Sequence, residues 1–416
     1  MLSQQDNELL TRTGPGTPMG NYLRRFWTPV MLESELGAPD AAPVRLKILG
    51  ESLVAFRDTS GRIGLLKAQC PHRGANLFWG RNEEGGLRCV YHGWKFDVTG
   101  QCMDMPNCPE GENLAARVKT PAYATKVHGG LLWAYMGPVD RLPAFPDIEI
   151  FALPQSHRYT CKIVCPANYF DLMEGDMDAS HPSFLHSRLD KAAIPGAFGF
   201  QSQMLDTKPR YTIEEEAYGL RLAAQRNAGP NEYQWRVTQY LLPYITLISA
   251  RRGERTYANI RVPIDDENSI NFRTYAHPDR ALRESDYDLI TPEMIPGTFF
   301  MKENIENDFL IDRDGQKHEK YTGIKSIVAE DVAVLSNRDT TIVDRTDEYL
   351  VSSDRAIITL RKRLIRGAKA LTEGTDPPEA SSPEAYRVRA LDIILPHNVP
   401  LAEGAPELYH PAPVAR

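Results

Sequence analysis

Two short loops, each with one cysteine and one histidine, limit what this chain can fold into more than any other feature. The first reads Cys70-x-His72 and the second reads Cys89-x-x-His92, with sixteen residues between His72 and Cys89. Glycines border both loops, and a backbone without a side chain can approach an inorganic group closely. Thiolates and imidazoles bind metals, so this region is expected to bring the two loops together around a metal group.

The way cysteine and histidine are paired helps to distinguish a structural zinc site from an iron–sulfur cluster, the two metal groups that these ligands could bind. Structural zinc modules usually pair cysteine with cysteine and histidine with histidine, whereas each loop here is mixed. Mixed loops favour a Rieske [2Fe–2S] cluster, in which the two thiolates bind one iron and the two imidazoles bind the other. A four-ligand zinc site is the alternative. The other cysteines have no matching partner and are not assigned to a metal: Cys102, Cys108, Cys161 and Cys165.

The pattern of apolar residues around these loops predicts a small all-β domain over residues 41–140, after a helical segment at residues 1–40. Short strands with tight turns are expected at 44–48, 53–57, 63–68, 87–90 and 131–135.

The remainder of the chain predicts an α+β domain over residues 141–372, with an antiparallel sheet flanked by helices. Strands are expected at 159–164, 210–215, 220–225, 233–241, 255–261 and 269–275. A helix follows from about residue 347, with Ala356, Leu360 and Leu364 on one face. Residues 373–416 are rich in proline and are expected to form an extended arm.

The charge balance argues against two classes of partner. The 416-residue chain has 48 Lys and Arg against 55 Asp and Glu, a net charge of −7, and no long basic block. Neither nucleic-acid binding nor a polybasic membrane anchor is expected of it. Its longest apolar stretches are far shorter than the ~20 residues of a membrane-spanning helix. Because no secretory signal is visible, a cytoplasmic location is expected.

A second group of potential ligands lies in the segment NYFDLMEGDMDASHPSFLH, residues 168–186. As a helix over 168–179, this segment would place Glu174, Asp178 and His181 on one face.

His186 completes this group, because Pro182 would end the helix and turn the chain back toward the same point. Two histidines and a carboxylate with open positions are ligands for a non-heme Fe(II) that activates O₂. The alternative is a solvated acidic helix face with two incidental histidines, which would leave the cluster with nothing to reduce.

Together these residues resemble the oxygenase component of Rieske non-heme iron oxygenases. The blocks TGPGTPMGNYLRRFW, GRNEEGGLRCVYHGWKFD and EGDMDASH are similar to the phthalate dioxygenase branch, and the resemblance covers about residues 5–370. It implies an N-terminal all-β Rieske domain with Cys70, His72, Cys89 and His92 as cluster ligands. It also implies a helix-grip, START-like catalytic domain that binds mononuclear Fe(II).

The resemblance also implies a third iron ligand in an E-D-x-x-V-like segment far downstream. The segment AEDVAV, residues 329–334, matches and assigns Asp331 beside His181 and His186. The competing acids are Glu330, Asp339 and Asp344.

By the same resemblance, the functional assembly is a head-to-tail homotrimer, sometimes stacked to a hexamer. The cluster of one subunit lies near the mononuclear iron of the next, and Asp178 is the acid that bridges the two sites. Electrons come from NAD(P)H through a separate flavin and iron–sulfur reductase, and O₂ is the co-substrate.

The implied reaction is dioxygenation of a small aromatic carboxylate, such as a phthalate or a substituted benzoate. The alternatives are a monooxygenase that performs O-demethylation or ether cleavage and, more distantly, a Rieske electron carrier. A carboxylate substrate favours an arginine partner. The candidates in the predicted sheet are Arg226, Arg236, Arg251, Arg252 and Arg255, with Arg226 and Arg251 preferred. Ser180 is a further candidate for substrate contact.

Overall fold

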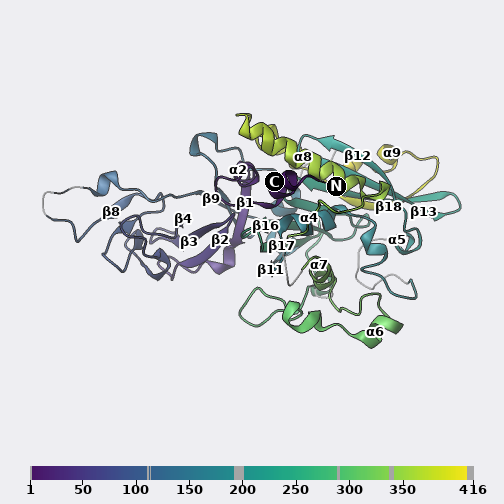
Figure 1. Cartoon of the computed structure of the whole chain (residues 1–416), viewed down its shortest axis with the longest axis horizontal. Helices are drawn as coiled ribbons and strands as arrows, with labels where there is room; N and C mark the ends of the chain where they lie inside the picture. The colour runs from purple at the N-terminus through teal and green to yellow at the C-terminus, as the bar shows by residue number, and fades with distance from the viewer. Residues whose placement is uncertain are drawn as a thin grey trace.

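The structure is a computed structural model of the whole chain, and it describes residues 2–109, 112, 114–191, 201–287, 291–336 and 342–409. The molecule is elongated, with small antiparallel sheets at one end and a larger domain of sheet and helices at the other (Figure 1). This architecture confirms the predicted α+β class. No helix in the described part of the chain is long and apolar enough to cross a membrane.

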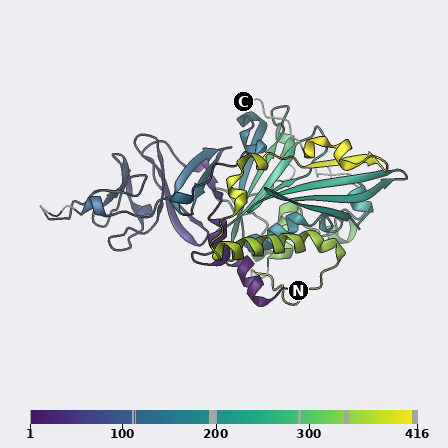
Figure 2. The same cartoon turned by 90° about the horizontal axis from the view of Figure 1, so that it is seen from above.

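The chain begins with two short helices that are capped by hydroxyl side chains. α1 (Gln4–Thr11) follows Ser3 and α2 (Pro18–Leu23) follows Thr17, and each hydroxyl accepts a backbone N–H of the first turn. Both helices pack against the long helix α8 (Arg355–Thr372) of the other domain. The view from above shows them beside α8 (Figure 2). The N-terminal helices therefore tie the start of the chain to the C-terminal domain.

Three antiparallel sheets form the N-terminal domain, in the orders β1-β10-β9, β2-β3-β4 and β5-β6-β7-β8. Their strands are β1 (Trp27–Leu32), β2 (Val44–Ile48), β3 (Glu51–Arg57), β4 (Ile63–Lys67), β5 (Arg81–Glu83), β6 (Gly86–Arg88), β7 (Lys95–Phe96), β8 (Cys102–Asp104), β9 (Ala124–His128) and β10 (Leu131–Tyr135). The prediction that residues 1–40 are helical is wrong for β1. Its β-branched Thr28 and Val30 are fully buried, which favours a strand against β10.

One eight-stranded antiparallel sheet organises the C-terminal domain, in the order β11-β17-β16-β15-β14-β13-β12 with β18 also on β14. The strands are β11 (Arg158–Cys165), β12 (Arg210–Glu216), β13 (Gly219–Gly229), β14 (Glu232–Leu241), β15 (Ile245–Ile248), β16 (Thr256–Pro263), β17 (Ser269–Ala276) and β18 (Leu391–Pro396).

β18 corrects the prediction that residues 373–416 form an extended arm. The short strand β15 pairs only with residues 239–241 of β14, so the other half of that edge is open. β18 pairs with residues 232–237 there and satisfies the backbone groups that would otherwise be exposed. This part of the proline-rich segment therefore belongs to the sheet.

Helix α4 (Tyr169–Met177) packs on the sheet and contacts both α7 (Ile327–Leu335) and α8. On α8, Ala356, Leu360, Leu364 and Ala368 of the inner face are fully buried, as the predicted apolar face requires. In Figure 1, α8 is drawn at the top of this domain, and α7 and α6 (Arg313–His318) at the bottom. The shorter helices are α3 (Glu149–Ala152), α4 (Tyr169–Met177), α5 (Ser202–Leu205) and α9 (Leu401–Gly404). α4 packs on β16 and against α7, which brings its C-terminal end close to α7.

Candidate metal centres and cavity

The two Cys/His loops of the N-terminal domain are built as the same turn, formed twice. Gly74 N donates to Cys70 O at 2.9 Å, and Gly93 N donates to Cys89 O at 3.0 Å. Both glycines have left-handed backbone angles, with φ of +75° and +78°, which a residue with a side chain rarely adopts. The loops therefore present their cysteines and histidines in equivalent ways, which suits two ligand pairs on one symmetric group.

The two cysteines of these loops are buried and the two histidines lie closer to the surface, as a cluster bound between the loops would require. Cys70 and Cys89 are 2% and 3% exposed, whereas His72 and His92 lie farther out, with ring centroids 4.4 Å apart. Burial, together with the neighbouring Cys89 thiol, raises the pKa of Cys70 to about 11, so a nearby cation is needed to ionise the Cys70 thiol at neutral pH. Nδ1 of His72 is buried and has no hydrogen-bond partner among the described residues. These features fit a metal group between the loops.

The second predicted ligand group also comes together. His181 lies in a short 3₁₀ turn (His181–Ser183) after α4, His186 follows that turn, and Asp331 lies on α7. One potential ligand atom from each lies within 4.8 Å of the others. Asp331 Oδ1 is 3.0 Å from His186 Nε2 and 3.8 Å from His181 Nε2. This set of two imidazoles and one carboxylate can bind a single divalent metal ion.

The charges in this group favour a bound cation. Burial opposes protonation of His186, but Asp331 outweighs it and raises the pKa of His186 to about 9. Burial likewise opposes ionisation of Asp331, but His186 lowers the pKa of Asp331 to about 2. The imidazole and the carboxylate therefore each stabilise the charged form of the other. A divalent cation bound by His186 and Asp331 would neutralise the same carboxylate.

The structure separates Asp331 from its competitors. Glu330 points away from the cavity and its Oε2 lies 2.7 Å from Nδ1 of His186. Asp344 is exposed, and its carboxylate accepts from the backbone and hydroxyl of Thr346. Asp339 lies outside the described residues.

The predicted helix face that joins Glu174 to this group is wrong. α4 ends at Met177, before the turn that Pro182 was expected to cause, and Asp178 is the residue that follows the helix. Glu174 therefore faces elsewhere and pairs with Arg345 at 2.9 Å and Arg361 at 2.6 Å.

Asp178 fixes the turn from which His181 projects. Its Oδ1 accepts from the backbone N and the hydroxyl of Ser180, both at 2.6 Å, and its Oδ2 accepts from His181 N at 3.2 Å. Oδ2 also lies 3.7 Å from His181 Nδ1. Burial opposes ionisation of Asp178, but His181 and Ser180 together lower its pKa. The Ser180 hydroxyl is thus used within this turn, and Ser180 does not line the cavity.

A cavity opens beside His181, His186 and Asp331, under the sheet. Its walls combine apolar and aromatic side chains with a few polar groups, which is typical of a site for a small organic ligand. The apolar and aromatic part includes Leu172, Met177, Leu222, Ile248, Tyr211 and Tyr257, and the polar part includes Gln203, Arg236, Asn259 and Arg273.

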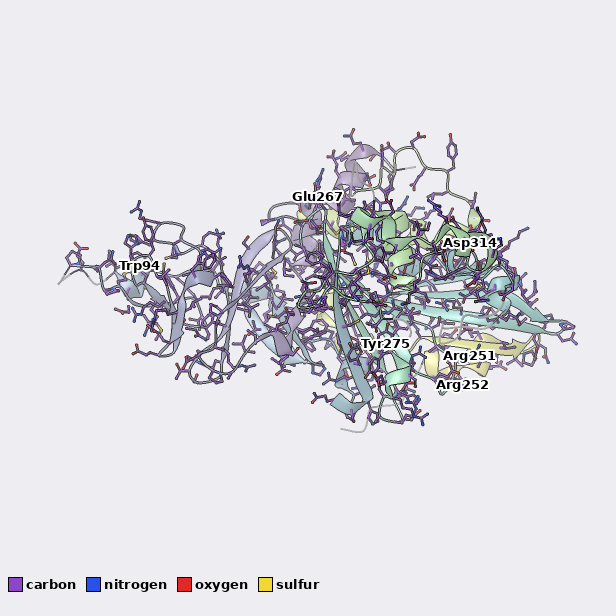
Figure 3. All side chains as sticks on the ribbon, turned by 90° about the horizontal axis from the view of Figure 1, so that it is seen from below. Trp94, Arg251, Arg252, Glu267, Tyr275 and Asp314 are labelled. Carbon is purple, nitrogen blue, oxygen red and sulfur yellow. The ribbon has the colours of Figure 1, made fainter. Side chains whose placement is uncertain are left out.

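Two of the predicted substrate residues lie outside this cavity. Arg226 is fully buried, and its guanidinium donates to the backbone oxygens of Ala179 and Asp206. Arg251 lies next to β18, where it forms a β-bridge with Asp392 and lines a different pocket. Figure 3 shows Arg251 and Arg252 together beside that strand.

Two other arginines occupy the expected place. Arg236, one of the five considered from the sequence, lines the cavity and donates to Gln203 Oε1 at 3.1 Å. Arg273 was missed, although a charged residue inside the otherwise buried strand β17 was a visible signal. Arg273 is 2% exposed, and its Cζ lies 4.4 Å from the ring centroid of Tyr257. Its Nε has no hydrogen-bond partner, and no carboxylate lies within ion-pair distance of it in the described part of the chain.

Comparison with known proteins agrees with these two centres. Residues 26–124 match the model of the Rieske [2Fe–2S] domain, and residues 134–402 match the LigXa C-terminal domain like model. The chain is 37% identical over 390 residues to the phthalate 4,5-dioxygenase oxygenase subunit of Pseudomonas putida, which covers 90% of this chain and 88% of that protein. It is 36% identical over 409 residues to the 3-chlorobenzoate-3,4-dioxygenase oxygenase subunit of Comamonas testosteroni, 93% of each chain.

Two further comparisons concern a protein with a different reaction and a solved structure with a similar fold. The 5,5'-dehydrodivanillate O-demethylase oxygenase subunit of Sphingobium sp. is 33% identical over 384 residues, 91% of this chain and 83% of that one. The crystal structure of dicamba monooxygenase bound to dicamba superposes with a TM-score of 0.60 at 17% identity, over 85% of this chain and 100% of that one. At that identity the likeness concerns the fold alone.

Proposed function

The chain belongs to the Rieske non-heme iron oxygenases, and from this premise we propose that it is the terminal oxygenase that hydroxylates a small aromatic carboxylate. Its cofactors are a Rieske [2Fe–2S] cluster and a mononuclear iron. When bound, the cluster delivers single electrons and the mononuclear iron activates O₂. We assign the cluster to Cys70, His72, Cys89 and His92, and the mononuclear iron to His181, His186 and Asp331.

The separation of the two ends of the molecule supports an assembly of several subunits. Trp94, which stacks on His72 with ring centroids 4.3 Å apart, lies near the outer end of the N-terminal domain (Figure 3). Tyr275 lies far from it in the C-terminal sheet and belongs to the same core cluster as Val332 of α7, the helix that carries Asp331 (Figure 3). An electron from the cluster of the same chain would have to cross much of the molecule. We therefore keep the prediction of a head-to-tail homotrimer in which a neighbour's cluster serves each iron site. Asp178 is then the bridging acid, because its Oδ2 already lies beside His181.

The main support for a carboxylate substrate is Arg273. This buried cation lies in the cavity and has no carboxylate partner among the described residues. Burying an unpaired charge costs several kcal/mol, so such a residue is expected to gain its partner from the ligand. Arg236 lies on the same wall and can add a second donor group. The apolar and aromatic walls suit a planar ring next to the carboxylate.

Dioxygenation is the reaction we favour, since two of the similar proteins are named as dioxygenase oxygenase subunits of aromatic carboxylates. A specific finding keeps a second reaction open: the similarity to an O-demethylase oxygenase subunit extends over nearly the whole chain. Either reaction would draw NAD(P)H electrons from a separate reductase, and a cytoplasmic location agrees with that supply.

Matched substrates test the proposal. With a surrogate reductase, turnover of phthalate and 3-chlorobenzoate is compared with turnover of their neutral amides. Loss of a hydrogen bond to a charged group costs about 1.5–3 kcal/mol, so the acids should be favoured by about 10- to 150-fold in kcat/KM. Arg273→Met should remove this preference, and Arg251→Met, outside the cavity, should keep it. Equal kcat/KM for acid and amide in the unmodified enzyme would contradict recognition of a carboxylate.

A further inference from the structure

Glu330 lies one residue before Asp331 on α7 and is fully buried. Its Oε2 accepts a hydrogen bond at 2.7 Å from Nδ1 of His186. Its Oε1 accepts from the Thr322 hydroxyl and lies 2.9 Å from Nζ of Lys320. A buried carboxylate is costly unless it is fully paired, and both oxygens of this one are paired.

This contact determines which nitrogen of His186 can bind a metal. A carboxylate at Nδ1 holds the proton on that nitrogen, and the lone pair is then on Nε2. Nε2 is the nitrogen that lies 3.0 Å from Asp331 Oδ1, inside the candidate iron site. Glu330 therefore orients both the ring and the proton of His186 toward metal binding.

The second histidine of the site is held differently. Nδ1 of His181 is buried without a hydrogen-bond partner among the described residues, and the Asp178 carboxylate lies 3.7 Å away. Oδ1 of Asp178 already accepts two hydrogen bonds from Ser180. Within the described chain, the hydrogen bond that orients an imidazole of this site therefore comes from Glu330, whereas Asp178 holds the backbone turn before His181.

Glu330 is itself fixed by the segment between α6 and α7. Lys320 Nζ donates to the backbone oxygens of Ile324 at 2.6 Å and Lys325 at 3.0 Å, so its charge has a fixed position next to Glu330. Thr322 is fixed in the same segment, because its Oγ1 accepts from Ile324 N at 3.2 Å. The carboxylate therefore cannot turn away from His186 without losing these partners.

We propose that Glu330 is a positioning residue that holds His186 for Fe(II), with Lys320 and Thr322 fixing Glu330 in turn. This role rests on the proposed function, since it takes His181, His186 and Asp331 as the iron site. Glu330 does not touch the substrate cavity, and its effect reaches the metal only through the His186 ring.

The test is Fe(II) binding to the cluster-loaded protein, measured anaerobically by equilibrium dialysis. Supporting residues of this kind typically change metal affinity about 10- to 100-fold, and we expect Glu330→Gln to weaken Fe(II) binding by that factor. Glu330→Ala should weaken it more, because the amide of glutamine can still accept from His186. The visible absorption bands of Co(II) bound in the same site should shift in both variants, which a purely structural role would not cause.

Glu303→Gln is the matched control. Glu303 is also a buried glutamate of this domain, 5% exposed, but it does not contact His186, so Fe(II) affinity and Co(II) bands should equal those of the unmodified protein. If Glu330→Gln fails to fold, Thr322→Val takes its place, with an expected loss of several-fold in Fe(II) affinity.

Two outcomes separate this inference from the proposed function. Unchanged Fe(II) affinity and Co(II) bands in Glu330→Gln, or unchanged affinity in Thr322→Val where that variant is needed, would overturn the role of Glu330 alone. The assignment of the iron site itself predicts that the unmodified protein binds Fe(II) and that Asp331→Ala does not. If the unmodified protein bound no Fe(II), or if Asp331→Ala bound it equally well, that assignment would be overturned instead.

Discussion

The two candidate metal centres of this chain are built in opposite ways. The cluster loops lie close together in the sequence, and each is closed by its own backbone hydrogen bond and its own left-handed glycine. The mononuclear site takes two ligands from the turn after α4 and the third from α7, which follows most of the C-terminal sheet in the sequence. The first centre is a local structure, and the second exists only when distant helices dock.

This difference determines what each centre should tolerate. Changes in the packing of α4 or α7 should reach the mononuclear site and leave the cluster loops intact. Changes inside one loop should alter the cluster and leave the C-terminal sheet folded. The following four variants test this separation, from the largest expected effect to the smallest.

Asp331→Ala should abolish mononuclear iron binding and substrate oxygenation, because the only carboxylate of the ligand group is lost. The visible spectrum of the cluster should remain, since no residue of the two loops changes. Iron analysis and the absorption spectrum check both points. Asp344→Ala removes an exposed acid and should behave as the unmodified protein; full iron content in Asp331→Ala would place the third ligand elsewhere.

Arg345→Met should destabilise the C-terminal domain by about 3–5 kcal/mol, because it leaves buried carboxylates without their cation. Arg345 is fully buried, pairs with Asp171 and Glu174 of α4, and so holds that helix in place. Thermal unfolding followed by far-UV circular dichroism measures the loss.

The matched control for this change is Arg366→Met, which removes an exposed ion pair with Glu215 and should cost at most about 1 kcal/mol. Cluster absorption followed during the same melt should show a later transition for the N-terminal domain in Arg345→Met. Loss of cluster and sheet in one step would contradict the independence of the two centres.

Asp178→Asn should slow electron transfer from the cluster to the mononuclear site by about 10- to 100-fold, as expected when the carboxylate beside a metal-binding imidazole loses its charge. Asparagine keeps one acceptor for the Ser180 contacts, so the turn and the iron content should survive. Rapid mixing of reduced enzyme with substrate and O₂ gives the rate of cluster re-oxidation. A rate equal to that of the unmodified protein would remove Asp178 from the electron path.

Trp94→Phe should have the smallest effect, about 0.5–1.5 kcal/mol on the thermal stability of the cluster, the usual net contribution of one hydrogen bond. The indole stacks on His72 at an interplanar angle of 10°, and its Nε1 donates to Asn107 at 2.8 Å. Phenylalanine keeps the stacking and loses the hydrogen bond. Cluster bleaching on heating measures the change, and Fe(II) binding at the mononuclear site should not respond.

Much of this protein is determined by its sequence alone. The mixed loops predicted both pairs of cluster ligands, because those ligands are close along the chain and the turn that presents them is local. The strand pattern predicted the α+β class, and the helical spacing of Ala356, Leu360 and Leu364 predicted the buried face of α8. Local hydrogen bonds and side-chain periodicity carry this information, and both can be read from neighbouring residues.

Only the tertiary structure decided the remaining features. Helix spacing placed Glu174 with His181, but α4 ends at Met177 and turns Glu174 toward Arg345 instead. Glu330 and Asp331 are adjacent acids that the sequence ranks only by resemblance. Docking of α7 directs one toward the Nδ1 side of His186 and the other toward its Nε2 side. The choice among the arginines depends on where along its strand each one lies, since β13 lines the cavity with Leu222 and Ala224 but not with Arg226. Each of these outcomes depends on contacts between segments far apart in the chain. The free energy of such contacts cannot be predicted from the pattern of neighbouring residues.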